Sequence, residues 1–201
     1  MIKLLKPLPK KLTVAFSGGV DSVAVVDFLR RKHEVTCAFF HHGTETSNQA
    51  NLFVTEFCKT YSLDLITQKI AKETPAAESY EEFWRNQRYS FLESIPGTVV
   101  TAHHLDDCIE TYIYGCLHGT PKVIPYSRNN IVRPFLTTRK QEFYTWCLKN
   151  NLEWCEDKTN TDRKYMRNFI RNEIVERAFY VNPGLDKVVK KIVLKNIEPK
   201  V

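Results

Sequence analysis

Short apolar runs alternate with amphipathic segments along the first two thirds of the chain. Five runs rich in β-branched and aromatic residues are typical of buried strands, and they lie at residues 12–16, 34–40, 63–70, 98–102 and 131–136. The segments between them place apolar residues at helical spacing, at residues 20–32, 47–61, 78–94 and 105–117. Because repeated strand–helix–strand units require right-handed crossovers, the pattern predicts an α/β fold in which a parallel sheet of about five strands carries helices on both faces.

The last third of the chain has a helical pattern. Residues 119–130 contain prolines and asparagines that interrupt regular elements, so we expect a mobile connection over the ligand-binding edge of the sheet. Three amphipathic segments follow, at residues 138–150, 163–179 and 185–195. Thr137 or Thr138 is a suitable cap for the first of them. We expect two parts, a domain over residues 1–136 that carries the sheet and a small, basic helical C-terminal extension over residues 137–201 that packs on it.

Charge is distributed unevenly along the chain. Residues 1–120 carry 12 Lys and Arg against 14 Asp and Glu, whereas residues 121–201 carry 17 against 9, and the whole chain has a net charge of +6. A basic segment beside a near-neutral domain favours a polyanionic partner, and RNA is the natural candidate. A solvated basic surface explains the same excess, so charge alone leaves both interpretations open.

Composition bounds the class of the protein. A chain of 201 residues with 43% hydrophobic content can bury one sizeable core. It has no apolar run near the roughly 20 residues that a membrane span needs, and residues 1–7 are too short and too charged for a signal peptide. The six cysteines form no C-x-x-C pair and no metal-ligand spacing, so we expect reduced thiols, no structural zinc and a cytoplasmic protein.

The stretch Ser17-Gly18-Gly19-Val20-Asp21-Ser22 joins the first predicted strand to the first predicted helix. Its two glycines allow the main chain to approach a phosphate closely, its serine hydroxyls can donate hydrogen bonds, and the helix N-terminus adds positive potential. The stretch is therefore typical of a phosphate-binding loop. An ordinary strand-to-helix turn capped by Ser17 or Asp21 fits the same residues.

Two arginines and a glutamate lie at helical spacing within residues 78–94. Glu82, Arg85 and Arg88 are spaced by threes, so both guanidinium groups lie near one face of the helix and could reach one ligand together. A surface ion pair between Glu81 and Arg85 is the structural alternative.

The cluster His103-His104-Leu105-Asp106-Asp107 follows the fourth predicted strand. A parallel sheet presents its ligands at the carboxyl ends of its strands, and a carboxylate there can hold Mg²⁺ against triphosphate oxygens. Capping of the next helix by Asp106 or Asp107 is the alternative. Four polar side chains in five residues make capping alone the weaker account.

Two arginines also share a face of the predicted helix at residues 163–179. Arg167 and Arg171 are four residues apart, while Met166, Ile170 and Ile174 form an apolar stripe, so we expect the arginines to face solvent or a ligand. Arginine suits a phosphate backbone, although a charged outer helix face is the usual outcome of such a pattern.

Ordered segments across residues 11–175 resemble the tRNA-isoleucine lysidine synthases, which are PP-loop ATP pyrophosphatases. Ser17–Ser22 matches the SGGxDS loop of that superfamily. The more discriminating segments are, in chain order, His41-His42-Gly43, Glu82-x-x-Arg85-x-x-Arg88-Tyr89, His103 through Asp107 to Glu110-Thr111, Arg133-Pro134-Phe135-Leu136, and Glu156-Asp157 through Asn160 to Arg171. The resemblance implies a Rossmann-like PP-loop ATPase fold with an ATP-binding domain over residues 1–136.

The resemblance also implies a two-step reaction on RNA. ATP adenylates the 2-carbonyl oxygen of the wobble cytidine of an isoleucine tRNA and releases pyrophosphate. The ε-amine of lysine then displaces AMP and gives lysidine. Mg²⁺ is implied as well, since a departing pyrophosphate needs cations and N–H dipoles around it.

Roles for single residues follow from the resemblance. Pyrophosphate is expected at Ser17, Gly18, Gly19, Val20 and Ser22, Mg²⁺ at Asp21 and Asp107, and phosphate or the adenylated intermediate at Arg85 and Arg88. His103 and Asp106 are expected to order the metal and the base, and Phe39, Phe40 and His41 to lie beside the adenine and ribose. RNA or lysine is expected at Lys122, Arg133, Arg139, Asp157, Asn160, Arg167, Asn168 and Arg171.

Two other functions stay open at this point. Related PP-loop enzymes transfer sulfur to RNA, but they commonly carry C-x-x-C pairs, which this sequence lacks. An RNA- or nucleotide-binding relative with reduced activity would gain little from keeping Asp21, Asp106 and Asp107. The sequence leaves the oligomeric state open, with a homodimer as one option.

Overall fold

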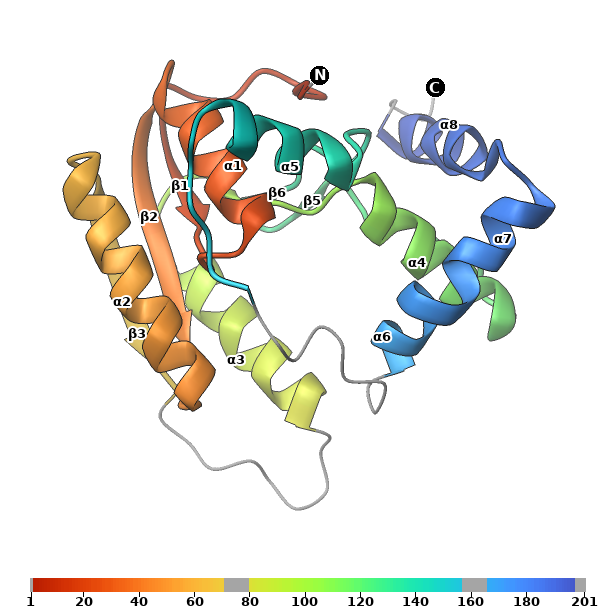
Figure 1. Ribbon diagram of the computed structural model, residues 1–201, viewed down its shortest axis with the longest axis horizontal. Coiled ribbons are helices and arrows are strands. Elements are labelled where there is room, and N and C mark those ends of the chain that lie inside the picture. The colour runs from red at the N-terminus through yellow and green to blue at the C-terminus, as the bar shows by residue number, and fades with distance from the viewer. Residues whose placement is uncertain (1, 71–79, 157–165, 198–201) are drawn as a thin grey trace.

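The computed structural model describes residues 2–70, 80–156 and 166–197, and its centre is one six-stranded sheet (Figure 1). The strands are β1 (Lys11–Ala15), β2 (Glu34–His41), β3 (Asp64–Lys69), β4 (Val99–Val100), β5 (Ser127–Arg128) and β6 (Ile131–Val132). They lie in the order β3-β2-β1-β4-β6-β5, and every neighbouring pair is parallel except β5 with β6. The five predicted strands are confirmed as the parallel part of the sheet.

A hairpin corrects the prediction for residues 119–130. We expected no regular structure there, but β5 pairs antiparallel with β6 across the two-residue turn Asn129-Asn130. Asn129 has a φ of +52°, in the left-handed region that asparagine tolerates and that tight hairpin turns require. The asparagines therefore form the turn of a hairpin instead of ending the regular structure.

Helices cover both faces of the sheet. α1 (Val20–Arg30), α2 (Glu45–Thr60) and α5 (Lys140–Lys149) share a core with β1 and β2, whereas α3 (Tyr80–Ser94) packs on the opposite face. Side chains of β2 alternate between these faces, so Phe39 is buried in the first core and Phe40 in the second. The predicted α/β architecture with helices on both faces is confirmed.

A third apolar contact joins α4 (Leu105–Leu117) to α8 (Leu185–Ile197) at one side of the sheet (Figure 1). Leu185, Val189 and Val193 are buried in it, as expected of the amphipathic segment at residues 185–195, but Val188, which we also expected to face inward, is 44% exposed. The boundary at residue 136 stays a prediction. α5, which follows that boundary, shares the core of the sheet through Phe143 and Cys147.

The helix predicted at residues 163–179 is divided within its described part. α6 (Met166–Phe169) is followed by a π-helical turn (Ile170–Ile174) and then by α7 (Val175–Val181). Because a π turn contains an extra residue, it breaks the simple helical stripe that the sequence suggests. Ile170 is buried as expected, but Met166, at the start of α6, is 59% exposed.

The start of α5 differs from the predicted cap. Neither Thr137 nor Thr138 caps the helix, because Arg139 is the residue before its first turn and makes no side-chain cap. Instead, the Asp106 carboxylate of α4 accepts a hydrogen bond of 2.7 Å from the Lys140 amide. A carboxylate from another element thus satisfies the N-terminus of α5.

Two further expectations concern the chain as a whole. In the described ranges, no helix has the length and apolar character that crossing a membrane requires. All six cysteines are unpaired, and Cys37, Cys58, Cys108 and Cys147 are buried, as expected of reduced thiols.

Candidate active site

The loop between β1 and α1 is shaped by its two glycines. Gly18 has a φ of +84°, and a Cβ atom there would lie 3.2 Å from Cδ1 of Phe53, so both backbone conformation and space require glycine. Gly19 precedes the first turn of α1, whose amide groups receive no side-chain cap. The Gly18 carbonyl accepts a hydrogen bond of 2.9 Å from the Cys155 amide, which ties the loop to the segment after α5. The amides at the start of α1 are therefore available to an anion.

Two hydroxyls complete the loop. The oxygens of Ser17 and Ser22 lie 3.1 Å apart, and the Ser22 hydroxyl donates to the Gly19 carbonyl at 2.9 Å. Val20 is the first residue of α1, so its amide lies at the positive end of the helix. The capping alternative does not hold in the described structure, since neither Ser17 nor Asp21 caps this helix.

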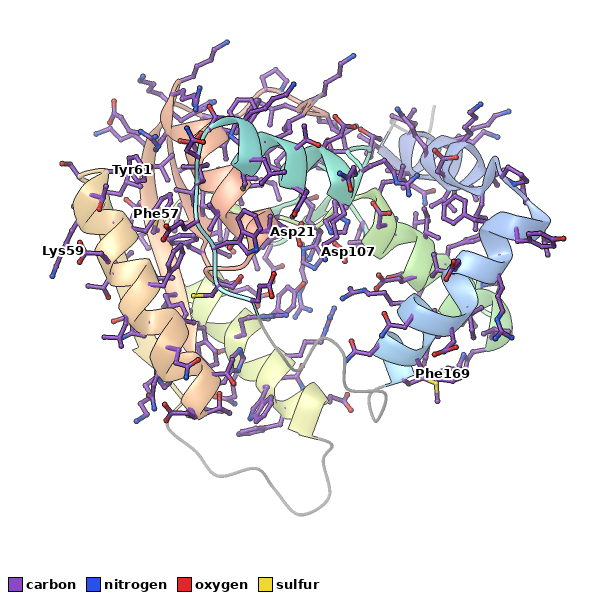
Figure 2. All side chains as sticks on the ribbon, in the orientation of Figure 1. Asp21, Phe57, Lys59, Tyr61, Asp107 and Phe169 are labelled. Atoms are coloured by element: carbon purple, nitrogen blue, oxygen red, sulfur yellow. The ribbon has the colours of Figure 1, made fainter. Side chains whose placement is uncertain are left out.

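His104 lies between the two aspartates that were expected to hold a metal ion. Its Nε2 is 3.5 Å from Oδ2 of Asp21, and its Nδ1 is 3.5 Å from Oδ2 of Asp107. The Asp107 amide donates to Nδ1 at 3.3 Å, and the Asp107 carboxylate accepts from the His104 amide at 2.9 Å. Figure 2 shows Asp21 and Asp107 next to each other where α1 and α4 approach. We call Asp21, His104 and Asp107 the carboxylate row.

The charges of this row support one another. Burial alone would lower the pKa of His104, but the carboxylates of Asp107 and Asp21 outweigh it and raise that pKa above its ordinary value. Burial likewise opposes ionisation of Asp107, but His104 outweighs it and lowers the pKa of Asp107. Asp107 therefore stays ionised near neutral pH and is able to act as a cation ligand.

The donor set of the row fits a magnesium ion. Oδ1 of Asp21 is buried and makes no hydrogen bond to any described residue. An orphaned, buried carboxylate oxygen is costly unless it gains a partner, and a hard cation is a suitable one. The described residues contain no cluster of three or more His, Cys, Asp and Glu that could hold a metal ion. Two carboxylates suit Mg²⁺, which usually takes its remaining ligands from water and substrate phosphates.

His103 points to a different partner from His104. Its Nδ1 lies 2.8 Å from the Thr101 hydroxyl, and burial, helped by Arg133 and Arg88, lowers its pKa to about 4. His103 is therefore neutral at pH 7 and can offer a hydrogen bond without a charge.

Asp106 was expected to order the metal and the base, which stays a prediction, and its Oδ2 lies 3.8 Å from Nδ1 of His104. Its carboxylate pairs with the Arg139 guanidinium at 3.0 Å and caps α5 through Lys140. Arg139 also reaches Asp186 of α8 at 3.4 Å and lies over the Phe179 ring. The structure thus places Asp106 and Arg139 at the joint between α4, α5 and α8. The predicted capping of the next helix is observed for Asp107, whose carboxylate accepts from the amide of His104, the residue before α4, whereas Asp106 caps α5.

Arg171 turns onto α4 instead of facing solvent. Its guanidinium donates to both carboxylate oxygens of Glu110, at 2.5 Å and 3.0 Å, and lies 3.7 Å from Asp107. Burial raises the pKa of Glu110, and Arg171 offsets only part of that effect. Arg171 belongs to the π-helical turn, an irregularity that is frequent at functional sites. Arg171 therefore joins the edge of the carboxylate row.

The aromatic residues at the end of β2 only partly match the expected adenine site. Phe39 and Phe40 are buried on opposite faces of the sheet, so their rings belong to the cores. His41 ends the strand, and its Nε2 lies 3.0 Å from Oδ1 of Asn48. Trp84 of α3 lies 5.5 Å from the His42 ring and is a further aromatic neighbour at this edge.

The remaining residues expected at RNA or lysine divide into three groups. Arg133 is buried beside Tyr89, near Arg85 and Arg88 of α3. Lys122 lines a cavity of about 110 Å³ together with Glu110, Thr111, Tyr114 and Ile170. Asn168 is partly buried in α6, whereas Asp157, Asn160 and the side chain of Arg167 lie outside the described residues.

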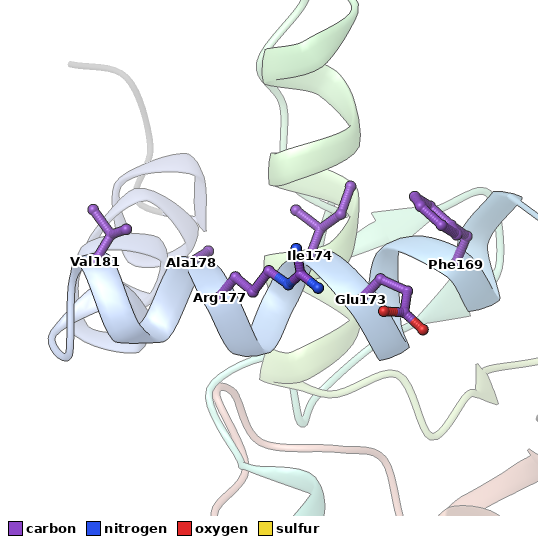
Figure 3. A pocket seen from close by; sticks show the side chains of 6 residues that line it. All are labelled: Phe169, Glu173, Ile174, Arg177, Ala178 and Val181. Carbon is purple, nitrogen blue, oxygen red and sulfur yellow. The ribbon is translucent and has the colours of Figure 1, made fainter.

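A larger hollow of about 330 Å³ lies on the outer side of the helix from α6 to α7 (Figure 3). It is lined by Phe169, Glu173, Ile174, Arg177, Ala178 and Val181. None of these residues belongs to the loop or to the carboxylate row, and none was expected at the active site.

Three residues of the site received no role from the sequence. His104 and Glu110 belong to the motif that starts at His103, and Tyr89 follows Arg88. An adjacent pair of histidines at a strand end hints that the two rings point in different directions. The contacts of Glu110 and Tyr89 depend on residues more than forty positions away, so sequence spacing could not assign them.

Comparisons with known proteins agree with this geometry. A family model described as a PP-loop domain matches residues 2–178. The tRNA(Ile)-lysidine synthase of Thermotoga maritima is 30% identical over 198 residues, which cover 90% of this chain and 48% of that protein. The protein of the same name from Thermosipho africanus is 32% identical over 201 residues, with 91% and 47% covered. The chain thus spans about half the length of these relatives.

A solved structure supports the fold. The NH3-dependent NAD synthetase of Campylobacter jejuni superposes with a TM-score of 0.51 at 18% sequence identity, covering 98% of this chain and 91% of that one. At this level of identity the similarity concerns the fold alone.

Proposed function

Because the chain belongs to the PP-loop domain family, we propose that it is an ATP-dependent ligase that adenylates the wobble cytidine of an isoleucine tRNA and joins lysine to it. The products are lysidine in the RNA, AMP and pyrophosphate. The observation that carries the proposal is the meeting of an uncapped, glycine-shaped loop with the carboxylate row at one edge of a parallel sheet. The names of two relatives at 30% and 32% identity support the choice of RNA and acceptor.

The first step requires an electrophilic α-phosphorus and a stabilised pyrophosphate. The 2-carbonyl oxygen of cytidine bonds to the α-phosphorus while the bond to the β-phosphate oxygen breaks, and the electron pair leaves with pyrophosphate. The amides after Gly19 and the hydroxyls of Ser17 and Ser22 would hold that leaving group. Arg88 would add positive charge from α3.

Magnesium would be held by Asp21 and Asp107, and it would neutralise charge on the triphosphate. His104 keeps the two carboxylates on either side of one ring, because its Nε2 lies 3.5 Å from Asp21 and its Nδ1 accepts from the Asp107 amide, and the carboxylates raise the pKa of the ring. It thereby fixes the direction of both carboxylates before ATP arrives.

The second step exchanges oxygen for nitrogen at C2 of the base. The lysine ε-amine bonds to C2, loses protons, and the bond from C2 to the adenylate oxygen breaks so that AMP leaves. We assign Lys122 and the Glu110–Arg171 pair to the lysine or RNA side of the site, since Lys122 and Glu110 line the cavity of about 110 Å³ and Arg171 lies 3.7 Å from Asp107.

The experiment that tests this proposal follows the nucleotide. ATP labelled at the α-phosphate is incubated with the protein, Mg²⁺, lysine and a transcript of isoleucine tRNA with a wobble cytidine, and labelled AMP is separated from ATP. We expect AMP and pyrophosphate in equal amounts, dependent on the RNA, and little AMP with a transcript carrying uridine at that position. Release of ADP and phosphate, or equal turnover on the uridine transcript, would reject the proposal.

A further inference from the structure

Four guanidinium groups surround a single aromatic ring at the same edge of the sheet. Their carbon atoms lie 4.6 Å (Arg128), 5.0 Å (Arg85), 5.8 Å (Arg88) and 5.9 Å (Arg133) from the centroid of Tyr89. Arg85, Arg88 and Tyr89 come from α3, Arg128 from β5, and Arg133 directly follows β6. We call these five residues the arginine cluster. The hairpin that the sequence did not reveal brings its two halves together.

Arg133 is the least exposed arginine of the cluster, at 3%. It donates to the Pro125 carbonyl at 3.0 Å and to the Tyr89 hydroxyl at 3.2 Å, and its Nε is buried without a hydrogen-bond partner among the described residues. Both acceptors are neutral groups, and no carboxylate of a described residue forms an ion pair with Arg133. Buried arginines are normally paired, because an uncompensated charge in a poorly solvated place is costly. Arg133 thus favours an anionic ligand nearby.

The charge of Arg128 is balanced, because its guanidinium pairs with Glu93 at 2.8 Å. Burial would raise the pKa of Tyr89, but Arg133, Arg85 and Arg88 outweigh it and lower that pKa. The charges of Arg133 and Arg88 also help to lower the pKa of His103, three residues after β4. Positive potential therefore extends from α3 to the middle of the carboxyl edge.

The cluster is separate from the phosphate loop. The loop follows β1 and Arg133 follows β6, and β4 lies between those strands. Because neighbouring strands are about 4.8 Å apart, the two positions are separated by roughly 10 Å. The α-phosphorus of ATP would lie near the loop after β1, and the RNA nucleotide that reacts with it would lie above β4. The backbone phosphate of that RNA nucleotide would then lie on the β6 side. Guanidinium groups match phosphate oxygens in geometry and charge.

We propose that Arg85 and Arg133, arranged around Tyr89, form a second anion site that binds a backbone phosphodiester of the RNA beside the modified base. The inference rests on the proposed function in so far as RNA is the second substrate. It adds a contact that positions the RNA strand and that is independent of ATP.

Two binding measurements test the site without any reaction. The affinity of the full chain for a fluorescent anticodon stem-loop of isoleucine tRNA is measured by anisotropy, without ATP, over a range of KCl concentrations. ATP affinity is measured separately by calorimetry without RNA. Arg85→Gln is the main variant, because Arg85 is exposed and its replacement leaves the core intact. Arg177→Gln removes an equal charge from the hollow of Figure 3 and serves as the matched control.

Stem-loops that carry one neutral methylphosphonate at a time locate the contact. We expect one linkage next to the wobble cytidine at which the neutral group weakens binding to the unmodified protein about tenfold, together with a fall of about 0.7 in the salt slope. Arg85→Gln should lose less than about twofold at that linkage, whereas Arg177→Gln should keep the full loss. ATP affinity should change less than about twofold in both variants.

The inference fails if Arg85→Gln and the unmodified protein lose the same affinity at every linkage. It also fails if Arg85→Gln weakens ATP binding and leaves RNA binding unchanged, because the anion would then be a phosphate of the nucleotide. Failure of the proposed function has another signature. The linkage-specific loss would remain in the binding assay, while the labelled-ATP experiment would give no RNA-dependent AMP.

Discussion

At the scale of single residues, the carboxylate row explains how two aspartates stay together in a partly buried place. Asp21 and Asp107 would repel each other if they were adjacent, but the His104 ring separates them. One oxygen of Asp21 is left without a partner among the described residues. This oxygen is the atom at which we propose that a cation binds.

Replacing Asp21 tests that interpretation. Asp21→Asn keeps the shape of the side chain and removes its charge, so we expect RNA-dependent AMP formation to fall by about 10²-fold or more while the protein remains folded. The loss should be measured with labelled ATP at saturating Mg²⁺. Asp64→Asn, at the exposed start of β3, is the matched control and should retain full turnover. Turnover close to normal in Asp21→Asn would remove this residue from the site.

Replacing Gly18 separates backbone strain from site shape. Gly18→Ala forces a side chain into a φ of +84° and toward Phe53, whereas Gly97→Ala imposes a φ of +81° with no atom within 4 Å of the new Cβ. Both variants should lose about 1 kcal/mol of stability to the backbone conformation. Only Gly18→Ala should lose about tenfold or more in ATP affinity by calorimetry. Equal ATP affinity in the two variants would contradict the assignment of the loop.

The low pKa of His103 predicts a dependence of stability on pH. The folded state holds this pKa at about 4, below the ordinary value of about 6.5, so the unfolded chain binds more protons between these values. The free energy of unfolding should therefore fall as the pH is lowered from about 6.5 to 4. Urea titrations at several pH values should show a shallower fall for His103→Gln. Parallel curves would mean that His103 is not buried as a neutral ring.

At the scale of elements, α4 and α5 are joined by Asp106, to which the resemblance gave a role with the metal and the base, and by Arg139, which it placed at RNA or lysine. Asp106 caps α5, and Arg139 connects it to Asp186 of α8. The spacing of the motif revealed that polar side chains gather after β4. It could not distinguish the aspartate that faces the site from the one that faces α5, because the distinction depends on a helix more than thirty residues later.

Removing Arg139 tests this joint. Arg139→Met should lower the free energy of unfolding by about 1 kcal/mol, because its two ion pairs are partly shielded and link three helices. Lys11→Met, which breaks an exposed pair with Glu34, should cost less than about 0.5 kcal/mol. Denaturation by urea measures both values. If Arg139→Met lost no more unfolding free energy than Lys11→Met, the joint would contribute little to stability.

At the scale of the whole molecule, the hydrophobic period predicted the strands of the sheet, and the glycine motif predicted a tight loop between β1 and α1. Both features are local in the sequence. The five parallel strands and the phosphate loop follow from residues close together in the chain. The hairpin at Asn129, the π-helical turn at Arg171 and the arginine cluster depend on contacts between distant segments. The surroundings of Tyr89 and of Arg171 were therefore the hardest to predict.

The most direct test of the central claim is the mass of the RNA product. After incubation with ATP, Mg²⁺ and lysine, the isoleucine tRNA transcript is digested and the fragment with the wobble cytidine is analysed by mass spectrometry. The account predicts that this nucleotide gains the mass of one lysine minus one water, and that the gain disappears without ATP. An unchanged cytidine, or a gain that corresponds to replacement of oxygen by sulfur, would contradict it.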